Sequence, residues 1–335
     1  MSGEHPFAQY IRALARGKRG SRDLTQEEAY AAFILILRNE VAAEQLGAFL
    51  MLMRLKEETP AELAGFVRAA RDTIGSFDNA TPVQLDWPSY AGKRRQLPWF
   101  ILSALLLAEN GVTVLMHGIG GRKDDRVYTP QAITALGLPH CRSLVEAGQS
   151  LTNHGFAFIE LSNFLPRLAE LIDMRPLFGL RTPVHSLSRL LNPLKATYVL
   201  QGIFHPGYKT THRDAALLLN EPHVAVIKGE GGEIERNPDI DNEIFTVHNG
   251  ESGVELWPAL FSGPRHLKDE TMDVRRLAAL WRGEIADEYG TAAVTGTAAI
   301  ALKLLGKTST FEDSQQLAHQ WWEGRNLNRL QSSVD

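Results

Sequence analysis

Apolar positions in the first 75 residues recur every three or four residues, the spacing of helices that pack on one face. In the first of these segments the apolar side chains are those of Ala29, Phe33, Ile34 and Leu37. Thr25, followed three residues later by Glu28, forms a capping-box sequence and predicts that this helix starts near Thr25. The same spacing recurs over 43–55 and 61–74. We therefore expect a small helical domain over 1–80.

Beyond residue 81 the pattern changes to short continuous apolar runs, which alternate with segments of helical spacing. Such runs are typical of strands buried on both faces, because helices cover both sides of a parallel sheet. The predicted strands are 83–87, 112–116, 156–159, 197–200 and 224–227. The predicted helices are 98–109, 130–135, 213–219, 273–282 and 291–305. The expected fold class is therefore α/β, with a central, mainly parallel sheet over 81–335.

Composition limits the partners and the cellular compartment that the sequence predicts. The 335 residues carry a formal net charge of −4, so no global basic signature indicates nucleic acid. Basic residues nevertheless gather near the N-terminus, and they include Arg12, Arg16, Lys18, Arg19 and Arg22. The single cysteine, Cys141, can form no internal disulfide, and the longest apolar run, 97–108, is shorter than the roughly 20 residues of a membrane span. We expect a cytoplasmic protein without membrane contact.

The turn after the first predicted strand carries three consecutive cations, Lys93, Arg94 and Arg95. A strand, a turn and a helix start form an anion cradle, because unpaired helical N–H groups point into the turn. The helix dipole repels cations there by roughly 0.3–1 kcal/mol each, which an anionic partner would offset. The turn has one glycine, Gly92, so anions would be held by side chains rather than backbone amides. A solvated basic turn is the alternative.

Three further turns carry candidate chemistry. His117 follows the second strand as a general acid or base, or as a structural residue, and glycines and the cations Arg122, Lys123 and Arg126 come after it. Arg175 and Arg181 could hold a carboxylate or phosphate bidentately, or be surface charges. The acidic residues of the fourth turn are Glu230, Glu233 and Glu235, which suit Mg²⁺ with a substrate phosphate, or else an exposed strand. Parallel strand ends would bring the turns after Trp87, Met116, Gly202 and Lys228 to one cleft.

Several stretches resemble the anthranilate phosphoribosyltransferase (TrpD) family, over nearly the entire chain. Residues 24–57 resemble the helical domain of that family, and 114–118 fall on its Lys-His-Gly-Asn-Arg motif. Residues 181–194 resemble its Arg-Thr and Gly-Pro-Leu-x-Asn-Pro region. The resemblance implies a nucleoside phosphorylase/phosphoribosyltransferase-like fold and a homodimer formed through the helical domains. It also implies that helices around 165–192 complete the domain of 1–80.

The motifs for phosphoribosyl pyrophosphate are altered at four places. The family's Gly-Thr-Gly-Gly-Asp-Gly loop falls on 88–93, which keeps one glycine, and its Asn-Ile-Ser-Thr stretch falls on 98–101, which has no hydroxyl group. Met116 replaces the lysine of the Lys-His-Gly-Asn-Arg motif. The metal-binding Asp-Glu pair aligns with Glu233 and Ile234, so one carboxylate is lost. Together these changes argue against the family reaction.

The YbiB-type branch of the family is the nearer resemblance. It shares the Pro-Ser-Tyr-x-Gly turn at 88–92, the Arg-Gly-Lys…Arg-Asp-Leu pattern at 16–24, and His205-Pro206. The branch resembles sequence-nonspecific nucleic-acid-binding proteins. This resemblance implies a homodimer that binds DNA, especially single-stranded DNA, or RNA. It implies no cofactor. The residues expected to contact it are Tyr90, by stacking on a base, and Lys93, Arg94, Arg95, Arg122, Lys123, Arg126 and Arg181, with Lys18 and Arg19 peripheral.

The alternative function is a Mg²⁺-dependent phosphoribosyltransferase with an acceptor other than anthranilate. In that interpretation His117, Arg181 and the loop 229–233, with Glu233 as the metal ligand, are remnants of the family site, and Mg²⁺ is the cofactor.

Overall fold

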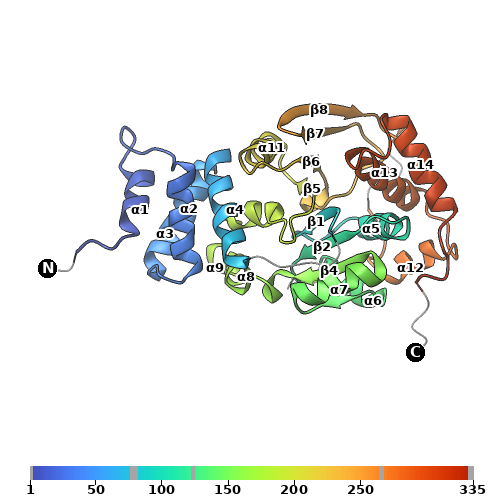
Figure 1. Ribbon diagram of the computed structural model, residues 1–335, viewed down its shortest axis with the longest axis horizontal. Coiled ribbons are helices and arrows are strands. Elements are labelled where there is room, and N and C mark those ends of the chain that lie inside the picture. The colour runs from blue at the N-terminus through green and yellow to red at the C-terminus, as the bar shows by residue number, and fades with distance from the viewer. Residues whose placement is uncertain (1–2, 76–81, 122–124, 264–267, 331–335) are drawn as a thin grey trace.

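The structure, a computed structural model, describes residues 3–75, 82–121, 125–263 and 268–330. A helical domain lies at one end, and an α/β domain built on an eight-stranded sheet makes up the remainder (Figure 1). The predicted fold class is therefore confirmed. Among the helices of the described ranges, none is long and apolar enough to cross a membrane.

The helical domain is built as the spacing predicts. Its first helices are α1 (Ala8–Ala15), α2 (Gln26–Leu37), α3 (Ala43–Lys56) and α4 (Pro60–Ile74). The predicted capping box starts α2: the Thr25 side chain accepts from the Glu28 amide, and the Glu28 side chain accepts from the Thr25 amide. Helices α2 and α4 approach closely at Gly65, where a Cβ would lie 2.3 Å from the carbonyl oxygen of Gln26. Only glycine allows this approach.

A later segment returns to the same core. It comprises α8 (Pro166–Asp173), α9 (Arg175–Phe178), α10 (Val184–Leu187) and the 3₁₀ turn η2 (Ser188–Leu190). Leu168 of α8 and Val184 of α10 belong to the hydrophobic cluster that contains Phe33 and Phe66 of α2 and α4. In Figure 1, α8 and α9 lie between the N-terminal helices and the sheet.

The sheet has the strand order β3-β4-β2-β1-β5-β6-β7-β8. The strands are β1 (Leu85–Ser89), β2 (Val114–Gly118), β3 (His140–Cys141), β4 (Phe156–Glu160), β5 (Tyr198–Ile203), β6 (His223–Lys228), β7 (Asn242–His248) and β8 (Glu251–Trp257). In this order, neighbouring strands from β3 to β6 are parallel to one another. Strand β7 is antiparallel to β6, and β8 is antiparallel to β7. This last hairpin is absent from the predicted strands, although its turn, Asn249-Gly250, is a typical hairpin signal.

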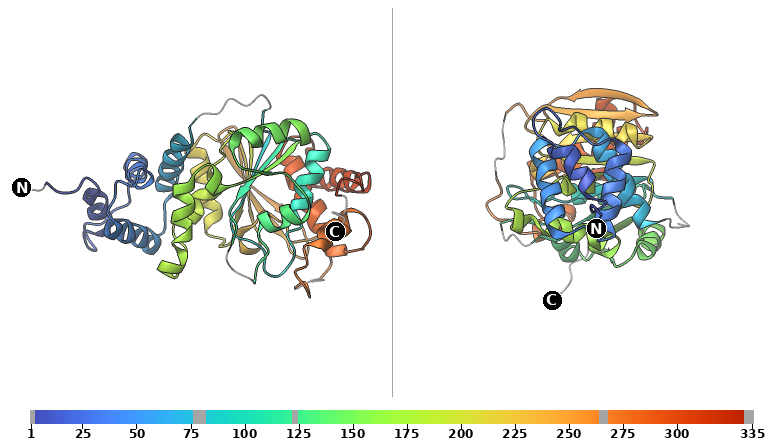
Figure 2. Two further views of the ribbon diagram at one scale, coloured as in Figure 1. Left: turned by 90° about the horizontal axis from the view of Figure 1, so that it is seen from below. Right: turned by 90° about the vertical axis from the view of Figure 1, so that its left-hand side faces the viewer.

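Helices cover both faces of the sheet, as the continuous apolar runs predict (Figure 2). They are α5 (Phe100–Glu109), α6 (Thr129–Ala135), α7 (Leu144–His154), α11 (Tyr208–Leu218), α12 (Arg275–Trp281), α13 (Glu288–Leu304) and α14 (Phe311–Glu323). In β2, Val114 and Met116 join the core that contains α5 and α13, whereas Leu115 between them joins the core that contains α7. Successive residues of one strand are therefore buried on opposite faces of the sheet.

We predict that Glu28 makes stability depend on acid pH. Hydrogen bonds from Arg22 hold the pKa of Glu28 at about 2, below its ordinary value of 4.5. Burial opposes this lowering by a smaller amount, and the Thr25 amide adds to it. Because the folded-state pKa is the lower one, the stabilisation is complete above pH 4.5 and is lost as the pH falls toward 2.

We expect Glu28→Gln to lower the melting temperature near neutral pH, and the difference from the wild type to shrink as the pH falls through this window. Circular dichroism melts across the pH range measure it, with Glu27→Gln in the same helical turn as the control. A difference that stays constant with pH would contradict the assignment.

Candidate functional site

The ends of four strands meet at one edge of the sheet. A Cβ added to Gly118, the last residue of β2, would lie 2.0 Å from the carbonyl oxygen of Ser89, the last residue of β1. A Cβ added to Gly202 of β5 would lie 2.4 Å from the carbonyl oxygen of Gly232, in the loop after β6. The turns after β1, β2, β5 and β6 thus lie at the same edge, because Gly118 and Gly202 allow the neighbouring backbones to come into contact.

A carboxylate of the chain itself occupies the turn after β1. Oε1 of Glu233 accepts from the backbone amides of Ala91 and Gly92 at 2.6 Å each, and Oε2 accepts from the Ser89 hydroxyl at 2.7 Å. Glu233 is fully buried. The predicted anion cradle therefore exists, but its anion is internal, held by short charge-assisted hydrogen bonds.

Two neighbouring carboxylates continue this arrangement. Glu230, in the 3₁₀ turn η3 (Glu230–Gly232), accepts from the backbone amides of Arg94 and Arg95 at 3.1 and 2.8 Å. Glu235 accepts from the amide of Phe100, at the start of α5, at 2.9 Å. Together with Glu233, they satisfy five backbone amides between residues 91 and 100. The prediction of an exposed strand at 233–235 is wrong, since Glu233 and Glu235 are buried in a loop.

Lys93 is the cation of this carboxylate cluster. Its ammonium group lies 2.6 Å from Glu235 and 3.2 Å from Glu230, and the residue is 2% exposed. Burial alone would lower the pKa of Lys93, but the two facing carboxylates raise it. Burial raises the pKa of Glu235 in turn. The prediction that Lys93 contacts an external phosphate is therefore corrected: its charge is already enclosed by two carboxylates.

Tyr90 and His117 are also turned inward. The Tyr90 hydroxyl lies 2.7 Å from Nδ1 of His117, whose Nε2 lies 3.2 Å from Asp86. Tyr90 is 3% exposed, and His117 and Asp86 are fully buried. Tyr90 has no face open to a nucleic acid base in this arrangement, so its predicted stacking role is corrected. Of the two roles left open for His117, the geometry favours the structural one, as a link between Tyr90 and Asp86.

The remaining predicted cations other than Arg181 divide into three groups. Arg94 and Arg95 are exposed, as are the peripheral Lys18 and Arg19. Arg126 is partly exposed and donates to the carbonyl oxygens of Ala91 and Gly92 at 3.0 and 3.1 Å, which anchors it to the same turn. The predicted residues Arg122 and Lys123 lie outside the described residues.

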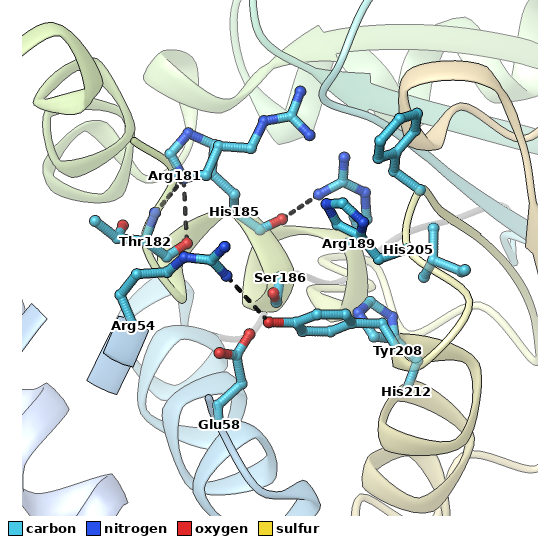
Figure 3. A pocket seen from close by; sticks show the side chains of 12 residues that line it. Arg54, Glu58, Arg181, Thr182, His185, Ser186, Arg189, His205, Tyr208 and His212 are labelled. Atoms are coloured by element: carbon cyan, nitrogen blue, oxygen red, sulfur yellow. Dashed lines mark hydrogen bonds between the residues drawn. The ribbon is translucent and has the colours of Figure 1, made fainter. Parts of the chain in front are cut away.

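Arg181 lines a separate pocket between the helical domain and the α/β domain (Figure 3). The lining residues are Arg54, Glu58, Arg181, Thr182, His185, Ser186, Arg189, Ile203, Phe204, His205, Tyr208 and His212. Burial and the neighbouring arginines lower the pKa of Arg181 to about 10. Burial and the arginines likewise lower the pKa of His185 to about 3, so its imidazole is neutral at physiological pH. The positive charge of the pocket therefore comes from arginine.

Arg54 and Arg189 are members of this pocket that the sequence did not predict. Arg189 is 6% exposed and lies in the mixed stretch 184–191, where its burial between leucines is visible only in the fold. Arg54 gives no signal either, because it lies in α3 and meets the pocket only through the tertiary fold.

We predict that Lys93 contributes to stability rather than to ligand binding. Lys93→Ala leaves Glu235 buried without its cation, which we expect to lower the free energy of unfolding by about 3–5 kcal/mol. Lys93→Met combined with Glu235→Gln removes both charges and should cost less than Lys93→Met alone. Urea denaturation measures these changes.

Arg94→Met is the matched control, because Arg94 is exposed, and its effect should stay within about 0.5 kcal/mol. A Lys93→Ala variant as stable as the wild type would show that the ammonium group is not held by the carboxylates.

Comparison with known proteins gives three findings. A family model described as "Glycosyl transferase family, helical bundle domain" matches residues 8–74. The anthranilate phosphoribosyltransferase of Oleidesulfovibrio alaskensis is 30% identical over 238 residues, which cover 70% of this chain and 72% of the relative. "Uncharacterized protein YbiB" of Escherichia coli (strain K12) is 31% identical over 206 residues, which cover 60% of this chain and 64% of the relative.

Among solved structures, the anthranilate phosphoribosyltransferase (TrpD) of Thermus thermophilus superimposes with a TM-score of 0.77 at 23% identity. The match covers 93% of this chain and 94% of that one. At this identity the likeness concerns the fold, including the arrangement of the helical domain before the mainly parallel sheet.

Proposed function

The chain belongs to the anthranilate phosphoribosyltransferase (TrpD-like) family, and from that premise we propose that it binds nucleic acid without sequence specificity rather than transferring a phosphoribosyl group. The observation that carries the proposal is the occupation of the turn after β1. Five backbone amides there are satisfied by carboxylates of residues 230–235, whereas the side chains of Arg94 and Arg95 face solvent. Anions from outside would meet guanidinium groups, not an amide cradle.

The same contacts weigh against the transferase alternative. A pyrophosphate group could use the amides of Ala91 and Gly92 only by displacing Glu233 into a buried, unpaired state. The residues present also do not fit a Mg²⁺ site, because both oxygens of Glu233 are engaged, Ile234 supplies no ligand and Glu235 is paired with Lys93. In the described part of the chain, no three histidine, cysteine or acidic residues gather as a metal site.

Side-chain binding of phosphates fits the remaining cations. Each guanidinium group offers paired donors that match a phosphate, and its long stem reaches an extended polymer. Because the amides of Arg94 and Arg95 are fixed by Glu230, the backbone beneath these two side chains is anchored. Arg126 and Arg181 are further contacts, with Lys18 and Arg19 peripheral. Contacts to phosphates position a protein but read no sequence, so the binding is nonspecific.

We also propose that the chain acts as a homodimer through its helical domain, which would join two such surfaces. Leu55 at the end of α3 is 84% exposed and Leu177 of α9 is 77% exposed, and a second helical domain would cover these two side chains. Sedimentation equilibrium should give twice the chain mass of 37.2 kDa, and Leu177→Asp should lower the association. A wild-type mass equal to one chain would refute the dimer.

We predict that affinity for single-stranded oligonucleotides falls steeply with salt, because each neutralised phosphate releases counterions. Replacing Arg94 and Arg95 together with Gln keeps the backbone amides that Glu230 accepts from, so the fold is retained. The double variant should reduce the magnitude of the slope of log K against log salt by about 1.4, two contacts at about 0.7 each. Fluorescence anisotropy over a salt series, with single- and double-stranded oligonucleotides, measures it.

Arg275→Gln is the matched control, since this arginine of α12 has a side chain that is 86% exposed and pairs with Asp273. Its slope should equal that of the wild type. Affinity and slope unchanged in the Arg94 and Arg95 double variant would overturn the proposed surface.

We further predict that Mg²⁺ does not change the binding of phosphoribosyl pyrophosphate in isothermal titration calorimetry. The amides that its pyrophosphate group would use are already occupied by Glu233. A saturable heat signal that requires Mg²⁺ would instead favour the Mg²⁺-dependent transferase.

A further inference from the structure

We propose that the pocket in Figure 3 binds a phosphate monoester, supplied either by the terminal phosphate of a nucleic acid strand or by a free nucleotide. The strand-end form rests on the proposed nucleic acid binding, whereas the free-nucleotide form does not. The pocket lies where α3, the segment before α10, and the start of α11 meet.

The charge of the pocket favours an anion. Arg54, Arg181 and Arg189 line it, and among the described residues neither Arg181 nor Arg189 forms an ion pair with a carboxylate, although the charge of Glu233 opposes the lowering of the pKa of both. Glu58 is the one carboxylate among the described residues that line the pocket, and burial raises its pKa while a hydrogen bond from Ser186 opposes this rise. Three arginines against Glu58 and Glu233 leave an excess of positive charge, which a phosphate monoester would balance.

Buried donors in the pocket lack partners. Nε of Arg189 and Oγ1 of Thr182 are buried and have no hydrogen-bond partner among the described atoms, although the two residues are only 6% and 4% exposed. Nη1 of Arg189 donates to the carbonyl oxygen of His185, which fixes the guanidinium group in place. Buried polar groups without partners are uncommon in folded proteins, and these two leave the wall of the pocket with donors that no neighbouring group uses.

Two histidines of the pocket, His185 and His212, add no charge of their own. Burial is the main cause that lowers the pKa values of His185 and His212 to about 3, with nearby arginines as the secondary cause. Both imidazoles are therefore neutral across the physiological range, and Arg181 and Arg189 supply the attraction.

A glycine turn connects the pocket to the basic turn after β1. Gly231 and Gly232 have φ values of +67° and +96°, which favour glycine. A Cβ on Gly232 would lie 3.1 Å from Nη2 of Arg189, and a Cβ on Gly231 would lie 3.3 Å from Nη1 of Arg126. The guanidinium groups of Arg126 and Arg189 thus approach the same turn. Arg126 therefore lies between the basic turn after β1 and the pocket that contains Arg189.

The space around the pocket suits a nucleotide end. Its own volume of ≈80 Å³ holds a small group rather than a single water, which needs only about 10–15 Å³. A neighbouring hollow of ≈340 Å³ shares Arg54, Glu58, His205 and Tyr208 with it and has room for a sugar. Phe204 at the pocket is 48% exposed, so it offers a face for a terminal base, the role that the buried Tyr90 cannot fill.

The first test uses the wild-type protein and single-stranded oligonucleotides of about ten nucleotides. Three otherwise identical strands carry a 5′-phosphate, a 3′-phosphate or no terminal phosphate. We expect one phosphorylated strand to bind at least tenfold more tightly than the strand without a terminal phosphate. Equal affinities with a normal salt dependence would overturn the strand-end form alone, whereas no binding of any strand would overturn the proposed function.

The second test separates the two sources of phosphate. Adenosine 5′-monophosphate and inorganic phosphate are titrated into the wild type by calorimetry, with adenosine as the control without phosphate. Binding of the nucleotide without a preference among the strands would assign the pocket to free nucleotides. No binding of either phosphate, together with equal affinities of the strands, would overturn the proposal in both forms.

Variants assign the effect to the pocket. Arg189→Gln should remove the preference for the phosphorylated strand, whereas the Arg94 and Arg95 double variant should weaken all three strands equally and keep the preference. Arg181→Gln, at a partly exposed position, repeats the test if the buried Arg189 variant does not fold. Arg275→Gln, outside the pocket, should change nothing. A preference that survives both Arg189→Gln and Arg181→Gln would place the phosphate elsewhere and overturn the assignment.

Discussion

The bonds between the Glu233 carboxylate and the turn after β1 are the contact on which the rest of the site depends. They join Ser89, Ala91 and Gly92 to a loop more than 140 residues away, and they fill the donors that an anionic ligand would otherwise use. Glu230 and Glu235 extend the same contact to the start of α5. With its amides satisfied from inside, the turn directs Arg94 and Arg95 to solvent. The site can then bind phosphates by side chains, which is the basis of the proposed function.

Local sequence was sufficient for much of the fold and for little of the site. The capping box at Thr25 and Glu28 and the buried runs of the parallel strands depend on neighbours within a few residues, so their pattern is visible in the chain. The fate of Lys93 depends on Glu235, 142 residues away. The polarity of Lys93 predicted an exposed side chain, and the alternation of polar and apolar residues over 233–235 was typical of a surface strand. Burial of paired charges is decided by tertiary contacts, which the sequence pattern does not show.

The arginine pocket illustrates the same limit. Arg181 was a candidate from the sequence, but its partners come from α3 and from the 3₁₀ turn after α10, and only the fold brings Arg54 and Arg189 to it. The turn after β1 and the pocket thus differ in kind. The turn is filled by the chain's own carboxylates, whereas the pocket combines an excess of arginines with buried donors that lack partners among the described residues. In the proposed function, phosphates are bound by arginine side chains and not by the amides that Glu233 occupies.

The most direct measurement is an NMR titration of the isotopically labelled protein with a single-stranded oligonucleotide. It follows the Nε–Hε signals of Arg94 and Arg95 beside the backbone amide signals of Ala91 and Gly92. If the cradle is closed and side chains bind the phosphates, the arginine signals shift with saturation while the two amide signals stay in place. Shifts of the Ala91 and Gly92 amides, with the arginine signals unchanged, would show that the ligand displaces Glu233 and would contradict the account.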